Sequence, residues 1–431
     1  MTNADSKFVF LTLENNKKRG NDMAKLAING GTPAVTDWIP TRWPIFNDKE
    51  KMALIETLES GNWCCMGHPD SKVAKFEREF AEYIGTKYTT CVTSGTGALE
   101  LAFRSCDIEP GDEVIVTAVS FVASASAIVL AGGVPIFVDV DPDTYQMLPD
   151  AVESAITDKT RIIEAVHYGG YPVDMDRIPE IAKKHNLFIV EDCAEAHGTE
   201  WRGKKVGSLG DIGAFSFQMG KNLTCGDGGA MTYSKDELAV SCYSYSRYGN
   251  IPGGERYVHY IPAGNFRMSE FLGAILSAQL SRHVEQTDIR YRNGEYFAQE
   301  LEKIGGISAL KREPRITKRG YYFYFLRYDS SKWDNVHRNK FREALAAEGV
   351  HAGTAHNDPI YMNPAFQNIK RSLLHGNKID YAKVHCPEAE RIYNSEVIAM
   401  GKDFLMEKGN IDKVLGAIQK LHDNMDELTK L

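Results

Sequence analysis

One lysine of this sequence has surroundings that suit covalent chemistry. Lys221 lies between two apolar runs in a glycine-rich segment, with Gly220 before it and Gly226 after it. Glycines at such positions allow the backbone to approach a ligand closely. An unprotonated lysine amine is a nucleophile that forms an imine with an aldehyde. A solvated loop lysine is the alternative interpretation, which the flanking glycines disfavour.

A carboxylate at the end of an apolar run is the second candidate. Asp192 follows the run 187–190 and the acidic Glu191. A carboxylate in this place can keep a pyridine nitrogen protonated, so that the ring withdraws electrons. A helix N-cap and a magnesium ligand are the alternatives for Asp192. Glu191 is interpreted as structural.

Hydroxyl groups and glycines at a strand-to-helix turn form a third candidate. Ser94-Gly95-Thr96 opens a predicted helix and can bind a phosphate through backbone N–H groups and side-chain hydroxyls. A simple helix cap is the alternative, because serine and threonine are common caps. Ser216 can add a hydroxyl to a phosphate site, and Phe121 can cover the face of a ring.

These candidates match what pyridoxal 5′-phosphate (PLP) requires of a protein. The requirements are an amine for imine formation, an acidic partner for the pyridine nitrogen, a phosphate cup and a surface against the ring. The sequence therefore predicts PLP as the cofactor. It predicts no metal site, since His167 has no second ligand at metal spacing and is interpreted as a hydrogen-bonded residue at a strand end.

The surrounding pattern predicts how these residues are positioned. Apolar runs alternate with amphipathic stretches, which is typical of an α/β domain with a mostly parallel central sheet. The carboxyl ends of parallel strands meet at one edge, so Ser94, Asp192 and Lys221 can converge there. The predicted strands are residues 88–92, 113–117, 134–140, 161–166, 187–190, 212–217 and 230–233, with a small-residue helix at 123–131.

The pattern also predicts how the chain divides into domains. Residues 1–22 are polar and lack periodicity, which predicts a disordered extension. Residues 23–274 are expected to form an N-terminal arm and the large domain. Residues 275–431 are expected to form a smaller α+β domain, with a strand at 321–328 and a closing amphipathic helix at 411–428.

Composition excludes several classes of protein. The 431 residues carry a formal net charge of −8, which argues against nucleic acid as a partner. No apolar stretch approaches the ~20 residues that a membrane-spanning helix needs. The eight cysteines include no CxxC pair and are too sparse for a disulfide framework, so a cytoplasmic location is expected.

The ordered set of motifs resembles the DegT/DnrJ/EryC1/StrS family of PLP-dependent sugar aminotransferases over most of the chain. Its markers are Leu26-Ala27-Ile28-Asn29-Gly30-Gly31, Ser94-Gly95-Thr96, Glu191-Asp192 with His197-Gly198, Ser216-Phe217 with Lys221, and Gly264-Asn265-Phe266-Arg267-Met268-Ser269-Glu270. The resemblance implies fold-type I of the PLP-dependent transferases, with a large domain and a smaller C-terminal domain.

The resemblance also implies a role for each site residue. It makes Lys221 the lysine that binds the cofactor as a Schiff base, Asp192 the partner of the pyridine nitrogen and Phe121 the stacking ring. It implies that Asn265 reaches the phosphate of the neighbouring subunit's cofactor, and therefore a homodimer. Glu195 stands where the family commonly has Gln or His near the cofactor's O3′. The phosphate-binding residues that it implies are Gly95, Thr96 and Ser216.

Within the family, Gly61-Asn62-Trp63 and residues 216–221 look most like the inosose aminotransferase and aminohydroxybenzoate synthase branch. The expected reaction is transfer of an amino group from glutamate or glutamine to a keto sugar or keto cyclitol. Three alternatives stay open: a nucleotide-sugar aminotransferase, a PLP-dependent dehydratase or lyase, and a PLP-binding regulatory protein without turnover. Relatives that dehydrate sugars carry histidine in place of the lysine, so Lys221 argues against that chemistry.

Overall fold

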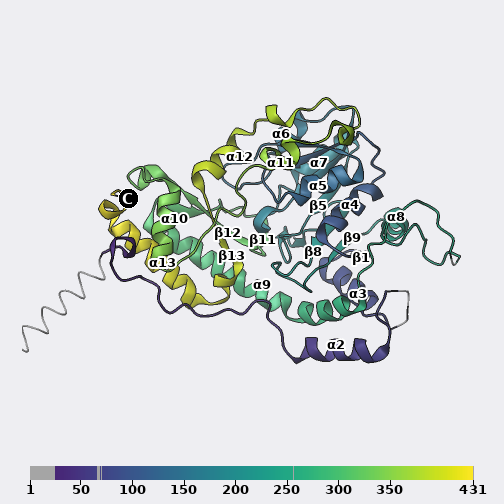
Figure 1. Ribbon diagram of the computed structural model, residues 1–431, viewed down its shortest axis with the longest axis horizontal. Coiled ribbons are helices and arrows are strands. Elements are labelled where there is room, and N and C mark those ends of the chain that lie inside the picture. Colours follow the sequence, from purple (N-terminus) through teal and green to yellow (C-terminus); the bar gives the residue numbers. More distant parts are fainter. Residues whose placement is uncertain (1–24, 66–67, 69, 256, 431) are drawn as a thin grey trace, which may run out of the picture.

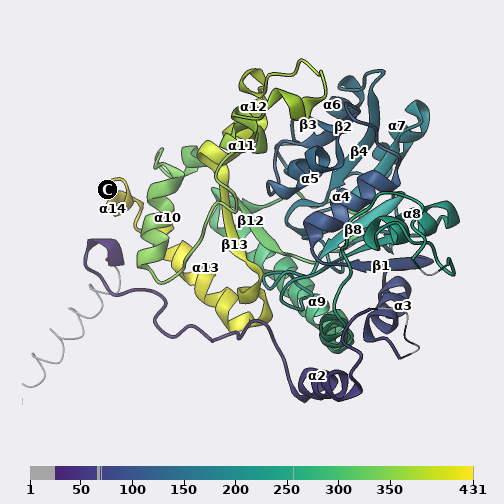
Figure 2. The same ribbon diagram turned by 45° about the vertical axis from the view of Figure 1, so that its right-hand side comes forward.

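The computed structural model describes residues 25–65, 68, 70–255 and 257–430. The predicted extension over residues 1–22 lies outside the described residues. Figures 1 and 2 show two lobes side by side, with the long helix α9 (Glu270–Ile304) running along both. Helix α9 contacts elements of each lobe, and it crosses residue 275 without a break. The division of the chain at residue 275 stays a prediction.

A seven-stranded sheet forms the large lobe, in the order β1-β9-β8-β5-β4-β2-β3. Only β9 runs antiparallel to its neighbours, so the expected mostly parallel α/β sheet is confirmed. The strands are β1 (Tyr88–Val92), β2 (Glu113–Thr117), β3 (Val134–Val138), β4 (Thr160–Val166), β5 (Phe188–Asp192), β8 (Ile212–Ser216) and β9 (Gly229–Tyr233).

Helices cover both faces of this sheet. Alternate residues of one strand point to opposite faces, and Val114 and Val116 accordingly join one apolar cluster while Ile115 joins another. The first cluster includes α4 (Gly95–Ser105), α5 (Ala123–Ala131) and α8 (Asp236–Ser246), and the second includes α6 (Pro149–Ser154) and α7 (Arg177–His185). Helix α3 (Lys72–Ile84) packs with Phe215 and Phe217 in a third cluster.

The smaller lobe is built on a three-stranded antiparallel sheet. Strand β12 (Phe323–Tyr328) lies between β10 (Ile307–Ala309) and β13 (Val397–Gly401). Helices α10 (Arg338–Ala347) and α13 (Lys408–Asp423) pack on it with α9, and Leu26 joins the same core. Residues Ile360, Tyr361 and Tyr381 instead pack into the core of the large lobe.

Several predicted elements differ in their limits. The strands predicted at 134–140, 161–166, 187–190, 212–217 and 230–233 differ from β3, β4, β5, β8 and β9 by one or two residues at their ends. Two differences are larger or have a clear local cause. Strand β12 begins at Phe323 because Tyr321 has a left-handed backbone with φ of 50°. The predicted helix over residues 411–428 is divided at Asn424 into α13 and α14 (Met425–Leu428). The other helices and strands are α2 (Asp48–Ser60), α11 (Pro364–Gln367), α12 (Pro387–Arg391), β6 (Glu200–Trp201), β7 (Lys204–Lys205) and β11 (Ile316–Lys318).

The structure also bears on the cysteines and on membrane-spanning helices. All eight cysteines are unpaired, as the absence of a disulfide framework predicts. Over the residues that the structure describes, no helix has the length and apolar character needed to cross a membrane.

Candidate active site

A cavity of about 530 Å³ lies where the sequence places the candidate residues. It opens beyond the carboxyl ends of β5 and β8 and at the start of α4, which is where α/β sheets usually bind ligands. Asn265 alone among the predicted site residues does not line it. The predicted residues that do are Gly95, Thr96, Phe121, Asp192, Glu195, Ser216 and Lys221.

The Lys221 amine is held inside this cavity by a carboxylate and a ring. Its Nζ lies 3.4 Å from Glu195 Oε1 and 4.1 Å from the centroid of the Tyr322 ring. The second oxygen of Glu195 accepts the backbone N–H of Gly169 at 2.9 Å, which fixes the carboxylate. The Lys221 side chain is only 13% exposed, so the amine is directed to the cavity and away from bulk water.

The loop that carries Lys221 is attached to distant parts of the chain. The Trp43 indole donates to the carbonyl of Met219 at 2.8 Å, and the Lys402 amine donates to the carbonyl of Gly220 at 2.6 Å. Burial lowers the pKa of Lys402 to about 8. These contacts join the N-terminal segment and the small lobe to the loop, so both contribute to the position of the Lys221 backbone.

Asp192 is the last residue of β5 and is buried. Its Oδ2 accepts the hydroxyl of Ser124 at 2.9 Å, and its Oδ1 accepts the N–H of Ala194 at 3.0 Å. Burial raises the pKa of Asp192 above its ordinary value, and these two donors and the Lys221 charge oppose that shift. A cation beside this carboxylate would favour its ionised form. The site therefore suits a protonated ring nitrogen.

The start of α4 offers a place for a phosphate. Ser94 caps the helix through its side chain, which accepts the N–H of Gly97 at 3.1 Å, so the capping interpretation applies to Ser94 itself. Among the described residues, no acceptor is found for the N–H groups of Gly95 and Thr96, which lie in the first turn of the helix. Free N–H groups at a helix start bind anions.

Gly95 also explains why this turn can approach the neighbouring strand. A Cβ atom added to Gly95 would lie 2.5 Å from the Cβ of Ser216, closer than any real contact. The absence of a side chain thus brings the helix start and the Ser216 hydroxyl to one point. Backbone N–H groups and a hydroxyl at the same point fit a phosphate.

The remaining predicted residues lie at the edge of the site and beyond it. Phe121 is 54% exposed, and its ring centroid lies 5.7 Å from that of His356. Asn265 is exposed outside the cavity of its own chain, where its Oδ1 accepts from Nε of Arg267 at 3.1 Å.

Ser124, Tyr322 and His356 are among the cavity residues that the sequence did not single out. Ser124 is the second residue of the predicted helix after β2, so its position at the same sheet edge could have been inferred. Tyr322 and His356 come from the small-lobe half of the chain and have no local pattern that marks them. Their positions depend on how the two lobes pack.

A buried group next to the site has the ligand types of a metal centre. It consists of His167, Glu191 and Cys193. His167 Nδ1 accepts the N–H of Val173, so its Nε2 donates to Glu191 at 3.0 Å. The other donors to Glu191 are the backbone N–H groups of Gly207, Leu209 and Gly210. These bonds confirm that His167 is a hydrogen-bonded residue and that Glu191 is structural.

The residues that line the cavity suit both the phosphate and the ring of PLP. The helix start with Ser216 suits the phosphate, Asp192 suits the ring nitrogen and the Lys221 amine lies in the same cavity. The fold and this arrangement define the class: an aminotransferase with the fold-type I architecture of PLP-dependent transferases.

The comparisons with known proteins identify the family within that class. A family model described as the DegT/DnrJ/EryC1/StrS aminotransferase family matches residues 45–419, and the chain belongs to this family. Aminotransferases of the family are PLP enzymes. The resemblance recognised in the sequence is therefore confirmed.

Several relatives are similar over nearly the whole chain. The L-glutamine:scyllo-inosose aminotransferase of Streptomyces griseus is 34% identical over 94% of this chain and 100% of its own. The 3-amino-5-hydroxybenzoate synthase of Amycolatopsis mediterranei (strain S699) is 35% identical over 81% of this chain and 89% of its own. A crystal structure of 3-amino-5-hydroxybenzoic acid synthase has a TM-score of 0.81 at 31% identity and covers 93% of this chain and 100% of that one.

Proposed function

We propose that this chain binds PLP and transfers an amino group from glutamine to a keto cyclitol. The observation that carries the proposal is the single cavity in which Lys221, Asp192 and the start of α4 meet. The names of relatives from the inosose branch support the cyclitol acceptor and the glutamine donor. Glutamate as donor and a keto sugar as acceptor are the broader possibilities within the same chemistry.

Each side chain then has a defined role. When bound, PLP supplies an electron-withdrawing ring and carries the amino group between the two substrates. Lys221 would hold the cofactor covalently, and its amine, once released, would move a proton at the substrate carbon. Glu195 Oε1, 3.4 Å away, and the Tyr322 ring, whose centroid is 4.1 Å away, hold that amine in the cavity. Asp192 maintains the proton on the ring nitrogen.

The choice of acceptor is tested by comparing two classes of ketone. We expect kcat/KM for scyllo-inosose to exceed that for a nucleotide-linked keto sugar by roughly tenfold or more. A site that makes its contacts with a free cyclitol ring gains no binding energy from an attached nucleotide. The measurement is amino product formed with glutamine as donor. The reverse preference would favour a nucleotide-sugar aminotransferase, and loss of water without consumption of glutamine would favour a dehydratase.

We also propose that the enzyme is a homodimer in which Asn265 completes the partner's phosphate site. In support, Asn265 is exposed and does not line its own cavity. Helix α2 and the segment after α8 project from the body (Figure 1) and carry exposed apolar side chains that a second copy could cover. These side chains are Met52, Ile55, Leu58 and Tyr260.

Mixing two inactive variants tests this arrangement. Lys221→Ala removes the amine, and Asn265→Asp places a negative charge next to the partner's phosphate. A heterodimer then has one site with native Lys221 and native Asn265 from opposite chains. With random exchange we expect roughly one quarter of the wild-type activity to return.

The matched control mixes Lys221→Ala with Asp192→Asn, two changes within one chain's own site, and we expect no recovery from that pair. Should the first pair also show no recovery after demonstrated subunit exchange, Asn265 would belong to its own chain's site.

A further inference from the structure

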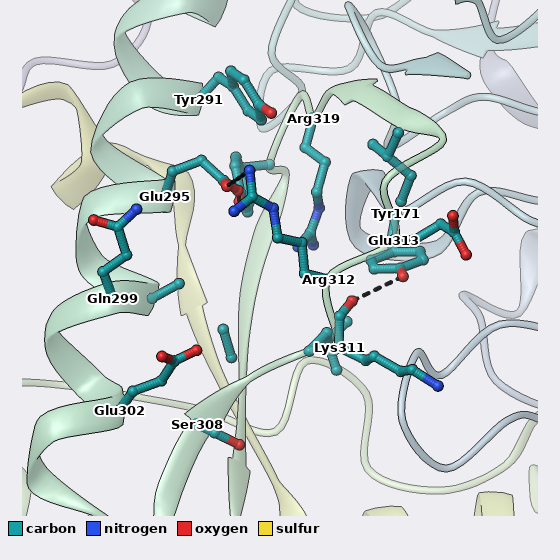
Figure 3. Close-up of a pocket in the computed structure, with 15 residues that line it drawn as sticks. Tyr171, Tyr291, Glu295, Gln299, Glu302, Ser308, Lys311, Arg312, Glu313 and Arg319 are labelled. Carbon is teal, nitrogen blue, oxygen red and sulfur yellow. Dashed lines mark hydrogen bonds and ion pairs between the residues drawn. The ribbon is translucent and has the colours of Figure 1, made fainter. Parts of the chain in front are cut away.

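A second cavity of about 160 Å³ lies between α9 and the segment 308–321, and it shares no lining residue with the active site (Figure 3). Its two walls differ in charge. Glu295, Gln299 and Glu302 project from α9. Lys311, Arg312 and Arg319 come from the facing segment, together with Glu313, whose carboxylate pairs with Arg315. A ligand that carries both a negative and a positive group would match these walls.

Arg319 is the unusual residue of this cavity. It is only 8% exposed, and its guanidinium carbon lies 4.7 Å from the Tyr171 ring centroid and 4.3 Å from that of Tyr321. No acceptor for its N–H groups is found among the described residues, and Nε and Nη2 are buried without a partner. Figure 3 shows no bond from Arg319 to the other residues of the cavity.

A buried cation without a counter-charge is unfavourable. The two tyrosine rings stabilise the Arg319 guanidinium through their faces, but a ring supplies neither a hydrogen-bond acceptor in its plane nor a negative charge. A carboxylate in the adjacent cavity would supply both. Guanidinium groups bind carboxylates more strongly than neutral acceptors because the bonds are charge-assisted.

The neighbours of Arg319 extend the basic wall and define the acidic one. The Arg312 side chain is 78% exposed at the mouth of the cavity and lies 3.6 Å from the Glu295 carboxylate. Glu295 also accepts the hydroxyl of Tyr321 at 3.2 Å. Glu302, two turns further along the same face of α9, is exposed and lines the same cavity. An ammonium group beside either carboxylate would be attracted by its negative charge.

We propose that this cavity binds a small α-amino acid, with its carboxylate at Arg319 and Arg312 and its ammonium toward the carboxylates of α9. The size is suitable, since a cavity of about 150 Å³ holds a molecule of about six heavy atoms. The site adjoins the active site through the backbone: Gly320, next to Arg319, accepts from the side chain of Asn222, which follows Lys221. The proposal does not depend on the reaction at Lys221.

The binding test uses a probe that cannot react with PLP. N,N-dimethylglycine has a carboxylate and an ammonium, but its tertiary amine forms no imine. 3-Methylbutanoate has the same shape and the carboxylate alone. Both are titrated into PLP-loaded enzyme by calorimetry. We expect N,N-dimethylglycine to bind at least roughly tenfold more tightly than 3-methylbutanoate, because only it contacts both walls.

Variants locate the binding. Arg319→Gln should weaken both probes by roughly tenfold or more, and Glu302→Gln should weaken only N,N-dimethylglycine. Arg312→Gln, at the exposed mouth, tests the basic wall if Arg319→Gln does not fold. Arg292→Gln, an exposed arginine of α9 outside the cavity, is the control and should change neither affinity.

Three results would overturn the proposal. They are the absence of binding up to roughly 50 mM probe, equal affinity for the two probes, and unchanged affinity after both arginine substitutions. The last result would place the probe at another site, such as the active-site cavity.

Discussion

Replacing Lys221 by alanine should lower the rate of amino transfer by roughly 10⁴-fold or more, because the variant lacks both the covalent link to the cofactor and the amine that moves the proton. The fold should persist, because the Lys221 side chain lines a cavity and its amine interacts there with Glu195 and Tyr322. The measurement is steady-state product formation with glutamine and scyllo-inosose, with circular dichroism as the check on folding.

A matched lysine provides the control for this prediction. Lys303 is 68% exposed and pairs with Glu300 on the surface of α9, so Lys303→Ala should change the rate by less than about twofold. Methylamine added to the Lys221→Ala variant should restore part of the activity, because a small amine can enter the space that the side chain leaves. If Lys221→Ala transferred the amino group at the wild-type rate without added amine, Lys221 would have no role in the reaction.

Replacing Asp192 by asparagine should lower the rate by roughly 10³-fold while the protein retains its fold and much of its cofactor. The amide has nearly the shape of the carboxylate: its oxygen can still accept the N–H of Ala194, and its NH2 group can donate to the Ser124 hydroxyl. It cannot stabilise a positive charge on the ring nitrogen, so the ring withdraws electrons less strongly. The measurement is kcat together with cofactor content after dialysis.

Ser124→Ala separates the charge of Asp192 from its orientation. This variant removes one hydrogen bond to the carboxylate, which is worth about 1.5–3 kcal/mol for a charged acceptor, so its loss of activity should be smaller than that of Asp192→Asn. Full turnover by Asp192→Asn would show that another carboxylate supports the ring nitrogen.

The sequence was sufficient to predict the sheet and much of the cavity. Strands β1 and β2 have their predicted limits because turn signals such as Ser94-Gly95 and Pro110-Gly111 follow or precede the apolar runs. The convergence of Asp192 with the start of α4 follows from the rule that parallel strands end at one edge. Only the parallel direction of the strands was needed for that prediction, and the order of the strands in the sheet was not predicted.

Other features depend on contacts between distant segments. Tyr322, Trp43 and Lys402 reach the Lys221 loop only because the small lobe and the N-terminal segment pack against it. The break between α13 and α14 at Asn424 has no proline or glycine to mark it. Asn265 lies outside its own cavity, so its predicted role depends on a second chain.

The claim that Lys221 carries the cofactor is tested most directly by reductive trapping. The PLP-loaded enzyme is treated with borohydride, digested and mapped by mass spectrometry for the phosphopyridoxyl group. Lys402 is the informative competitor, since it is a buried lysine with a pKa lowered to about 8 that lies 5.7 Å from the same Tyr322 ring. We predict that the group is found on the peptide containing Lys221. Its presence on Lys402, or on any other lysine in place of Lys221, would contradict the assignment of the active site.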